Sequence, residues 1–83
     1  MSSAVDQTRR MHGTYDKTAD AAYLYLTEEI QPGESRRQAV VEAEGLSAMV
    51  VLDFDHRDHL IGIEIVGARG LLRPETIDRL DRL

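Results

Sequence analysis

Two stretches of the sequence decide the fold, YDKTAD at residues 15–20 and LIGIEI at residues 60–65. The first carries two aspartates that can hydrogen-bond nearby backbone N–H groups, as turn-forming residues do. In the second, three isoleucines alternate with other residues, which is the period of two that is typical of a β-strand. The two stretches therefore predict a hairpin turn and a core strand in a β-rich domain.

Further strands are expected on either side of these stretches. Pro32 and Gly33 occupy the central positions of a type II turn at residues 31–34. The pattern places strands at residues 11–15, 21–27, 35–42, 48–54 and 59–66. We therefore predict an α+β fold, an antiparallel β-meander of four to five strands with one C-terminal helix packed on one face.

The expected helix begins at Pro74 and runs to about Arg82. Proline suits the first turn of a helix because its missing N–H would be unpaired there anyway. Ile77, Leu80 and Leu83 follow at a spacing of three residues, so they form an apolar stripe that can cover the sheet.

The length of 83 residues allows one domain, predicted at residues 11–83 and preceded by a mobile tail at residues 1–10. A chain this short buries only about 60–65% of the surface that its unfolded form exposes, so a second copy would add stability. The sequence contains no cysteine, and neither a disulfide framework nor a thiolate metal site is expected.

Charge and hydropathy exclude two classes of partner. A formal net charge of −5 opposes attraction to phosphate, so nucleic acid is not an expected partner. Residues 1–11 contain no apolar run of signal-peptide length, and the stretch at residues 46–52 is too short to span a bilayer. We expect a cytoplasmic protein without membrane contact.

One short helix cannot cover both faces of such a sheet. The second apolar set includes Tyr23, Tyr25, Met49 and Val51, and self-association would shelter it from water. The sequence therefore predicts a homodimer through this face.

The candidate site is drawn from acidic and tyrosine side chains, with no catalytic, cofactor-binding or metal-binding residue assigned. Its members are Asp16, Asp20, Tyr23, Tyr25, Asp53 and Glu64.

Each part of this set has a structural interpretation beside the functional one. Asp16 and Asp20 are a conceivable carboxylate pair for acid–base catalysis, but aspartates at the two ends of a turn also satisfy backbone donors. Glu64 interrupts an apolar strand, so it either bonds a tyrosine hydroxyl or one of Arg36 and Arg37, or lines an acidic pocket with Asp53.

A cluster of acidic and histidine side chains at residues 53–59 has the composition of a divalent metal site but the spacing of no known one. Turn chemistry explains Asp55 and Asp58 equally well. Neither a serine-hydrolase motif nor a phosphate-binding loop is present, so nucleophilic catalysis has no support.

Four blocks of the chain, in order, resemble the bacterial family catalogued as domain of unknown function 2283. They are Tyr15-Asp16 with Ala19-Asp20, Tyr23-Leu24 with Leu26, Val51 to Asp55, and Leu60 to Ile65 followed by Ala68. The resemblance covers roughly residues 13–69. The chain departs from it at Gly13-Thr14, where a bulky apolar residue is usual, and at residues 57–59, where the family usually has Asp-Gly; His56 and His59 are therefore poor candidates for a shared function.

The resemblance implies a small β-rich α+β fold with no established activity, cofactor or catalytic residue. Family genes that neighbour small toxin-like genes suggest an antitoxin or interaction role. We therefore expect a non-enzymatic protein-interaction module that forms a homodimer and binds, at most, another small protein. The alternative is a small-molecule or metal-binding domain, or a small enzyme, that uses the acidic and tyrosine-bearing face.

Overall fold

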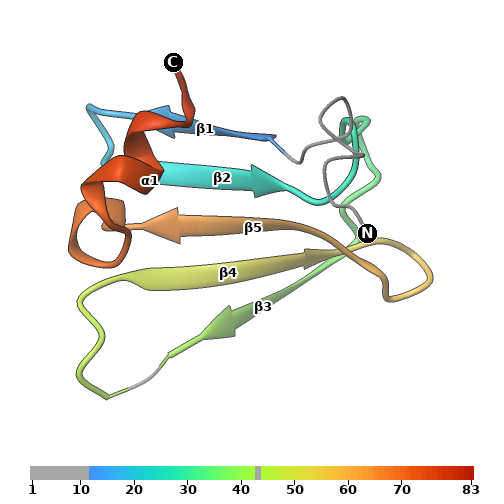
Figure 1. Ribbon diagram of the computed structural model, residues 1–83. Helices are drawn as coiled ribbons and strands as arrows, with labels where there is room; N and C mark the ends of the chain where they lie inside the picture. The colour runs from blue at the N-terminus through green and yellow to red at the C-terminus, as the bar shows by residue number, and fades with distance from the viewer. Residues whose placement is uncertain (1–11, 43) are drawn as a thin grey trace, which may run out of the picture.

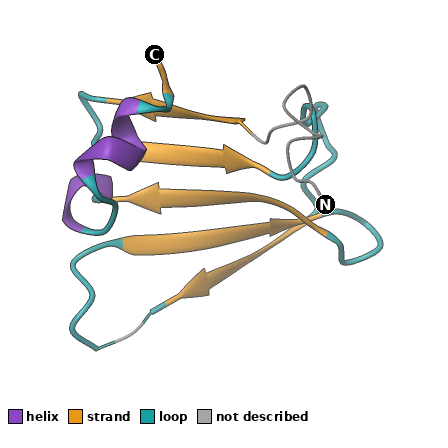
Figure 2. Cartoon of the chain, in the orientation of Figure 1, coloured by secondary structure: helices purple, strands orange, loops and turns teal. Residues whose placement is uncertain are grey.

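The computed structural model describes residues 12–42 and 44–83, which form one six-stranded sheet with a small helical segment (Figures 1 and 2). The predicted mobile tail at residues 1–10 lies outside these ranges. The elements in chain order are β1 (His12–Asp16), β2 (Ala21–Tyr25), β3 (Arg37–Val41), β4 (Met49–Phe54), β5 (Leu60–Val66), the 3₁₀ helix η2 (Ala68–Gly70), α1 (Pro74–Asp78) and β6 (Asp81–Arg82).

The strands do not follow one another as a meander. Their order across the sheet is β3-β4-β5-β2-β1-β6, so β2 pairs with β5 instead of β3 (Figure 1). The segment between β2 and β3 carries the chain to the far edge of the sheet. β2 and β5 have apolar residues on both faces, and the centre of a sheet shelters such strands best. The predicted antiparallel meander of four to five strands is therefore wrong in connectivity and in strand number.

The C-terminus also departs from the prediction, because α1 ends at Asp78 and not near Arg82. The following residues form β6, which pairs with β1 in parallel and makes the sheet mixed. The backbone N–H of Leu83 donates to the carbonyl of Tyr15 at 3.0 Å. This pairing satisfies backbone groups at the edge of β1, and it leaves Leu83 79% exposed instead of in the predicted apolar stripe.

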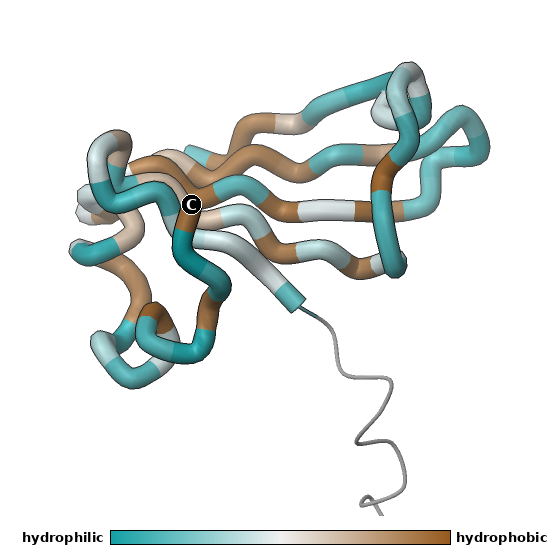
Figure 3. The backbone as a smooth tube through the Cα atoms, turned by 90° about the horizontal axis from the view of Figure 1, so that it is seen from above, coloured by the Kyte–Doolittle hydropathy of each residue, from teal (hydrophilic) through white to brown (hydrophobic). Residues whose placement is uncertain are grey.

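The core lies between one face of the sheet and the η2–α1 segment. Tyr15, Ala22 and Ile65 from the strands pack with Ala68 of η2 and Ile77 of α1, and all five are buried. Seen from above, the C-terminal segment lies on one side of the sheet (Figure 3). The predicted packing of a C-terminal helix on one face is therefore confirmed; we call this the helix face.

The opposite face carries the tyrosines. The register places Tyr23 beside Glu64, and Glu64 beside Val51, while Tyr25 lies beside Gly62. Since residues directly opposite in neighbouring strands point to the same side, these side chains share one face. We call it the tyrosine face and define it by Tyr23, Tyr25, Val40, Met49, Val51, Asp53, Gly62 and Glu64. Both helical segments pack on the other side.

The helical content of the described residues is small. α1 is five residues long, and neither described range contains a helix with the length and apolar character needed to cross a bilayer.

Candidate functional site

The centre of the tyrosine face is a hydrogen-bonded chain of three side chains from three strands. The Tyr23 hydroxyl donates to Oδ2 of Asp53 at 2.5 Å, and Nε2 of Gln38 donates to Oδ1 of the same carboxylate at 2.7 Å. Asp53 is 5% exposed, so both of its oxygens have a protein partner where water has little access. Because a buried carboxylate is costly without such partners, this arrangement fixes the three side chains relative to one another.

Gly62 makes room for this arrangement. A Cβ atom at this position would lie 2.6 Å from Cζ and 2.8 Å from Cε2 of Tyr23, so the tyrosine ring occupies the space that a side chain would need. Gly62 thus permits the close approach of the Tyr23 ring. Glycine here has a steric purpose that outweighs its usual cost in a strand.

The aromatic stack continues along the face from Tyr23. Its ring meets that of Tyr25 edge to face at a centroid distance of 4.8 Å, and Tyr25 stacks on His12 at 4.5 Å. Nε2 of His12 in turn lies 3.1 Å from the carbonyl oxygen of Glu28. The rings therefore form a rigid, partly exposed surface of the kind that is enriched in protein interfaces.

The electrostatics of this cluster oppose acid–base or nucleophilic chemistry at neutral pH. Burial raises the pKa of the Tyr23 hydroxyl far above its usual value of about 10, and the hydrogen bond to Asp53 raises it further. Tyr23 therefore stays protonated and keeps donating to Asp53. Both oxygens of Asp53 accept hydrogen bonds from the protein, one from Tyr23 and one from Gln38.

Glu64 is half-buried beside Tyr23 and Val51, and its carboxylate forms no side-chain hydrogen bond within residues 12–42 and 44–83. The predicted hydrogen bond from a tyrosine or from Arg36 or Arg37 is therefore wrong. The partly exposed carboxylate meets water in place of a protein partner, and Glu64 is an acidic side chain on the tyrosine face.

Asp20 is not part of this face and has a structural position on the other side of the fold. Its Oδ1 accepts from the Tyr15 hydroxyl at 2.7 Å and from the backbone N–H of Arg69 at 3.0 Å. Its carbonyl oxygen accepts from the N–H groups of Gly67 and Ala68 at 2.8 and 3.0 Å. Asp20 thus ties the β1–β2 turn to the beginning of η2 and holds Ala68 next to the 15–20 motif.

The hydrogen bond between Tyr15 and Asp20 shifts the pKa values of both groups. Donation from Tyr15 is the main cause that lowers the pKa of Asp20, and the N–H and charge of Arg69 lower it further. The same hydrogen bond raises the pKa of Tyr15. The favoured state is therefore an ionised Asp20 with a neutral Tyr15.

Asp16 is a turn acceptor, as its structural interpretation predicted. Its Oδ1 accepts from the backbone N–H groups of Thr18 and Ala19 at 3.0 and 3.3 Å. Asp16 and Asp20 thus serve different backbone donors, Asp16 within the β1–β2 turn and Asp20 at η2. The six candidate residues separate into the tyrosine face and two turn positions.

The acidic and histidine cluster is also a turn. Oδ1 of Asp55 accepts from the N–H groups of Arg57 and His59 at 2.8 and 2.9 Å, and these bonds lower the pKa of Asp55, that from His59 most strongly. Asp58 has a positive φ of 64° within it. Among the described residues, no three histidine, aspartate or glutamate side chains gather closely enough to hold a metal ion. The turn interpretation is confirmed.

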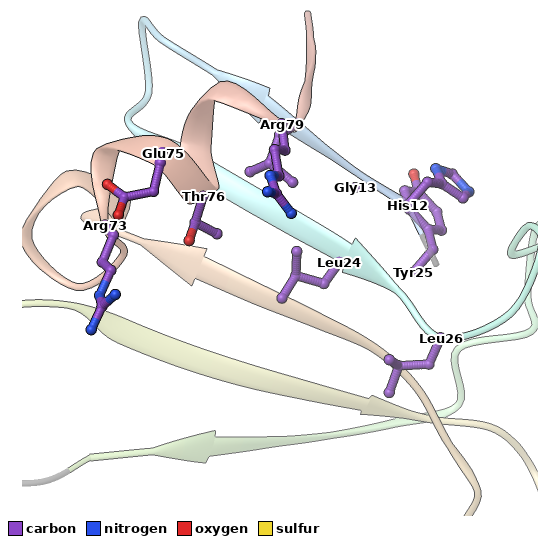
Figure 4. A pocket seen from close by; sticks show the side chains of 10 residues that line it. His12, Gly13, Leu24, Tyr25, Leu26, Arg73, Glu75, Thr76 and Arg79 are labelled. Atoms are coloured by element: carbon purple, nitrogen blue, oxygen red, sulfur yellow. The ribbon is translucent and has the colours of Figure 1, made fainter. Parts of the chain in front are cut away.

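A groove of about 450 Å³ lies on the helix face between α1 and the β1–β2 hairpin (Figure 4). Leu24 and Leu26 form part of its apolar lining, and Arg73 and Arg79 line it from the C-terminal segment. Neither arginine forms an ion pair with a described residue. The groove therefore combines apolar walls with two arginines and one acidic side chain, that of Glu75.

Sequence reasoning missed two of these residues. Gln38 and Tyr15 were not among the candidates, although each donates to a candidate aspartate. Tyr15 lies in the same short motif as Asp20, and this proximity was an available signal. For Gln38 there was no such signal, because its contact with Asp53 depends on the register between β3 and β4.

One family model, described as Protein of unknown function (DUF2283), matches residues 13–69. The matched segment includes the Tyr23–Asp53–Gln38 chain and the Tyr15–Asp20 pair, and it stops before α1. No curated protein and no solved structure matches the chain.

Proposed function

Because this chain belongs to the DUF2283 family, described only as of unknown function, we propose from its own surfaces that it is a non-enzymatic protein-interaction module that acts as a homodimer. The observation that carries the interaction role is the one-sided covering of the sheet. Both η2 and α1 pack on the helix face, while the tyrosine face has no covering element among the described residues.

The composition of the tyrosine face supports binding to a protein. Its apolar side chains include Val40, 53% exposed, and Met49, 43% exposed, beside the ordered rings of Tyr23 and Tyr25. Tyrosine and methionine are enriched in interfaces because they offer large contact areas, and rigid rings lose little entropy on binding. An antitoxin-like role, with a small toxin as the partner, is one form of this proposal.

The chemistry of the face argues for binding over catalysis. The buried carboxylate of Asp53 is held by Tyr23 and Gln38, and the raised pKa of Tyr23 keeps its proton in place at neutral pH. A catalytic acid or base needs a pKa near the working pH and a path to the substrate. The Tyr23–Asp53 pair is instead suited to hold the surface rigid.

A second candidate function is supported by the groove beside α1. Its apolar walls and the cationic side chains of Arg73 and Arg79 suit a small molecule with an apolar body and a carboxylate (Figure 4). Decanoate is a suitable probe: this candidate function expects it to raise the melting temperature of the wild-type protein and to have less effect on an Arg79→Gln variant. No shift with either protein would remove this candidate.

Sedimentation equilibrium of the full chain tests the main proposal. One chain has a mass of 9.3 kDa, and we expect the mass of two chains at micromolar concentrations. The mass of a single chain across the range of about 1–100 μM would contradict homodimer formation, because a dissociation constant above about 100 μM corresponds to an association free energy weaker than about 5.5 kcal/mol.

A further inference from the structure

The edge strand β3 is the most open strand edge in the described sheet. It lies at one end of the strand order and pairs only with β4 (Figure 1). The other end is β6, which is two residues long and offers little edge for pairing. β3 is five residues long and contains no proline, so an extended chain can add to it with a full set of backbone hydrogen bonds.

The side chains of β3 are also open to a partner. Val40 is 53% exposed and Val41 is 39% exposed, and they point to opposite faces of the sheet. Exposed β-branched residues on both sides of an edge favour pairing with another strand, because the partner covers apolar surface on each face.

The charges that flank β3 are self-complementary. Arg36 precedes the strand and Glu42 follows it, and neither forms an ion pair with a described residue. Antiparallel pairing of two copies about a two-fold axis through Ala39 brings residues whose numbers sum to 78 opposite each other. Arg36 of one copy then lies opposite Glu42 of its partner, and the symmetry makes this ion pair twice.

With the two-fold axis through Ala39, all five residues of β3 are paired. Ala39 is the centre of Arg37–Val41, so every residue of the strand finds a partner in the second copy. An axis through Gln38 or Val40 would leave residues unpaired at the ends. An axis between two residues would place a residue whose N–H and C=O point toward the partner strand opposite a residue whose N–H and C=O point away from it. Antiparallel pairing does not allow this arrangement.

We propose that two copies of this chain join through their β3 edges, antiparallel and with Ala39 on the two-fold axis, to form one continuous sheet. This inference rests on the proposed homodimer and specifies its interface. The contact lies at the sheet edge and not on the tyrosine face, where Glu64 is a half-exposed acidic side chain. The edge pairing places both tyrosine faces on the same side and leaves them free for another partner.

Cysteine cross-linking tests the register in a chain that has no cysteine of its own. At the axis the two Ala39 Cα atoms would be about 4.5–5.5 Å apart, within the range that a disulfide spans. We expect Ala39→Cys to form a covalent dimer under mild oxidation. Gln38→Cys and Val40→Cys should cross-link efficiently only when the two proteins are mixed, because residue 38 lies opposite residue 40 of the second copy. Thr18→Cys, in an exposed turn, is the control and should stay monomeric on non-reducing gels.

Charge exchange provides a test that introduces no disulfide. Arg36→Glu alone and Glu42→Arg alone should each weaken dimerisation about tenfold, because each turns two attractive pairs into two repulsive ones. The double exchange should restore the affinity, and Thr18→Glu, in the exposed turn between β1 and β2, should leave it unchanged.

The outcomes separate this inference from the proposed function. A dimer that persists by sedimentation but neither cross-links at Ala39 nor responds to the charge exchange would overturn the β3 interface and leave the homodimer intact. A wild-type chain that is monomeric throughout would overturn both.

Discussion

Removal of one hydroxyl from the tyrosine face should destabilise the fold measurably. Tyr23→Phe deletes the donor that lies 2.5 Å from Oδ2 of Asp53 and leaves this oxygen of a 5% exposed carboxylate without its protein partner. A hydrogen bond to a charged group contributes about 1.5–3 kcal/mol, and partial access of water to Tyr23 favours the lower half of that range. We therefore expect a loss of about 1.5–2 kcal/mol.

This loss would be a large part of the total stability. A chain of this length is stable by roughly 4–12 kcal/mol, and about 1 kcal/mol shifts the melting temperature by about 4–8 °C. Urea unfolding followed by far-UV circular dichroism, at one fixed protein concentration, should show a lower midpoint with an unchanged slope. The melting temperature should fall by about 10 °C.

Tyr25→Phe is the matched control. Tyr25 lies two residues further along the same strand, and its hydroxyl forms no hydrogen bond with any residue in 12–42 or 44–83. Its loss should cost less than about 0.5 kcal/mol, as for most surface changes. In an Asp53→Asn background, where the acceptor is neutral, Tyr23→Phe should cost only about 0.5–1.5 kcal/mol. Equal effects of the two phenylalanine variants would refute the assigned role of the Tyr23–Asp53 bond.

Two further variants test the other structural assignments. Asp20→Asn keeps an acceptor oxygen at the β1–β2 turn but removes the charge. The fold lowers the pKa of Asp20, so the ionised carboxylate stabilises the wild-type protein relative to the variant. This stability difference should be complete above the unfolded pKa of about 3.9 and should disappear as the pH falls through the folded pKa. A constant difference in urea midpoint between pH 7 and pH 2 would contradict this. Gly62→Ala should destabilise by about 1–3 kcal/mol through overpacking against the Tyr23 ring, although alanine usually stabilises a strand relative to glycine. A more stable Gly62→Ala variant would show that the ring does not need this space.

Much of the local structure was predictable from the sequence. The alternation in residues 60–65, the turn aspartates and the proline at the start of α1 act over a few residues, so their physical effects do not depend on distant parts of the chain. The separation of Tyr23 from Leu24 onto opposite faces follows from the same period of two. Packing of a C-terminal helix on one face was also predictable from the apolar position of Ile77.

The candidate site was predictable only in part. Tyr23, Tyr25, Asp53 and Glu64 do share one face, as the strand periods indicated. The alternative that gave Glu64 a hydrogen bond was wrong, because periodicity gives the face of a residue but not which neighbour reaches it. The buried acceptor is Asp53, and only the pairing of β4 with both β3 and β5 brings the two donors to it.

Strand order and the ends of the chain depended on contacts between distant residues. The residues of β2, β3 and β5 predict each of them as a strand. Whether β2 pairs with β3 or with β5, however, depends on which arrangement places the most apolar strands in the centre of the sheet. In the same way, residues 81–82 carry no strand signal and become β6 because the edge of β1 offers backbone hydrogen bonds. Local periodicity thus specified the elements and their faces, and tertiary pairing decided the strand order, the buried hydrogen bonds and the open edge of β3.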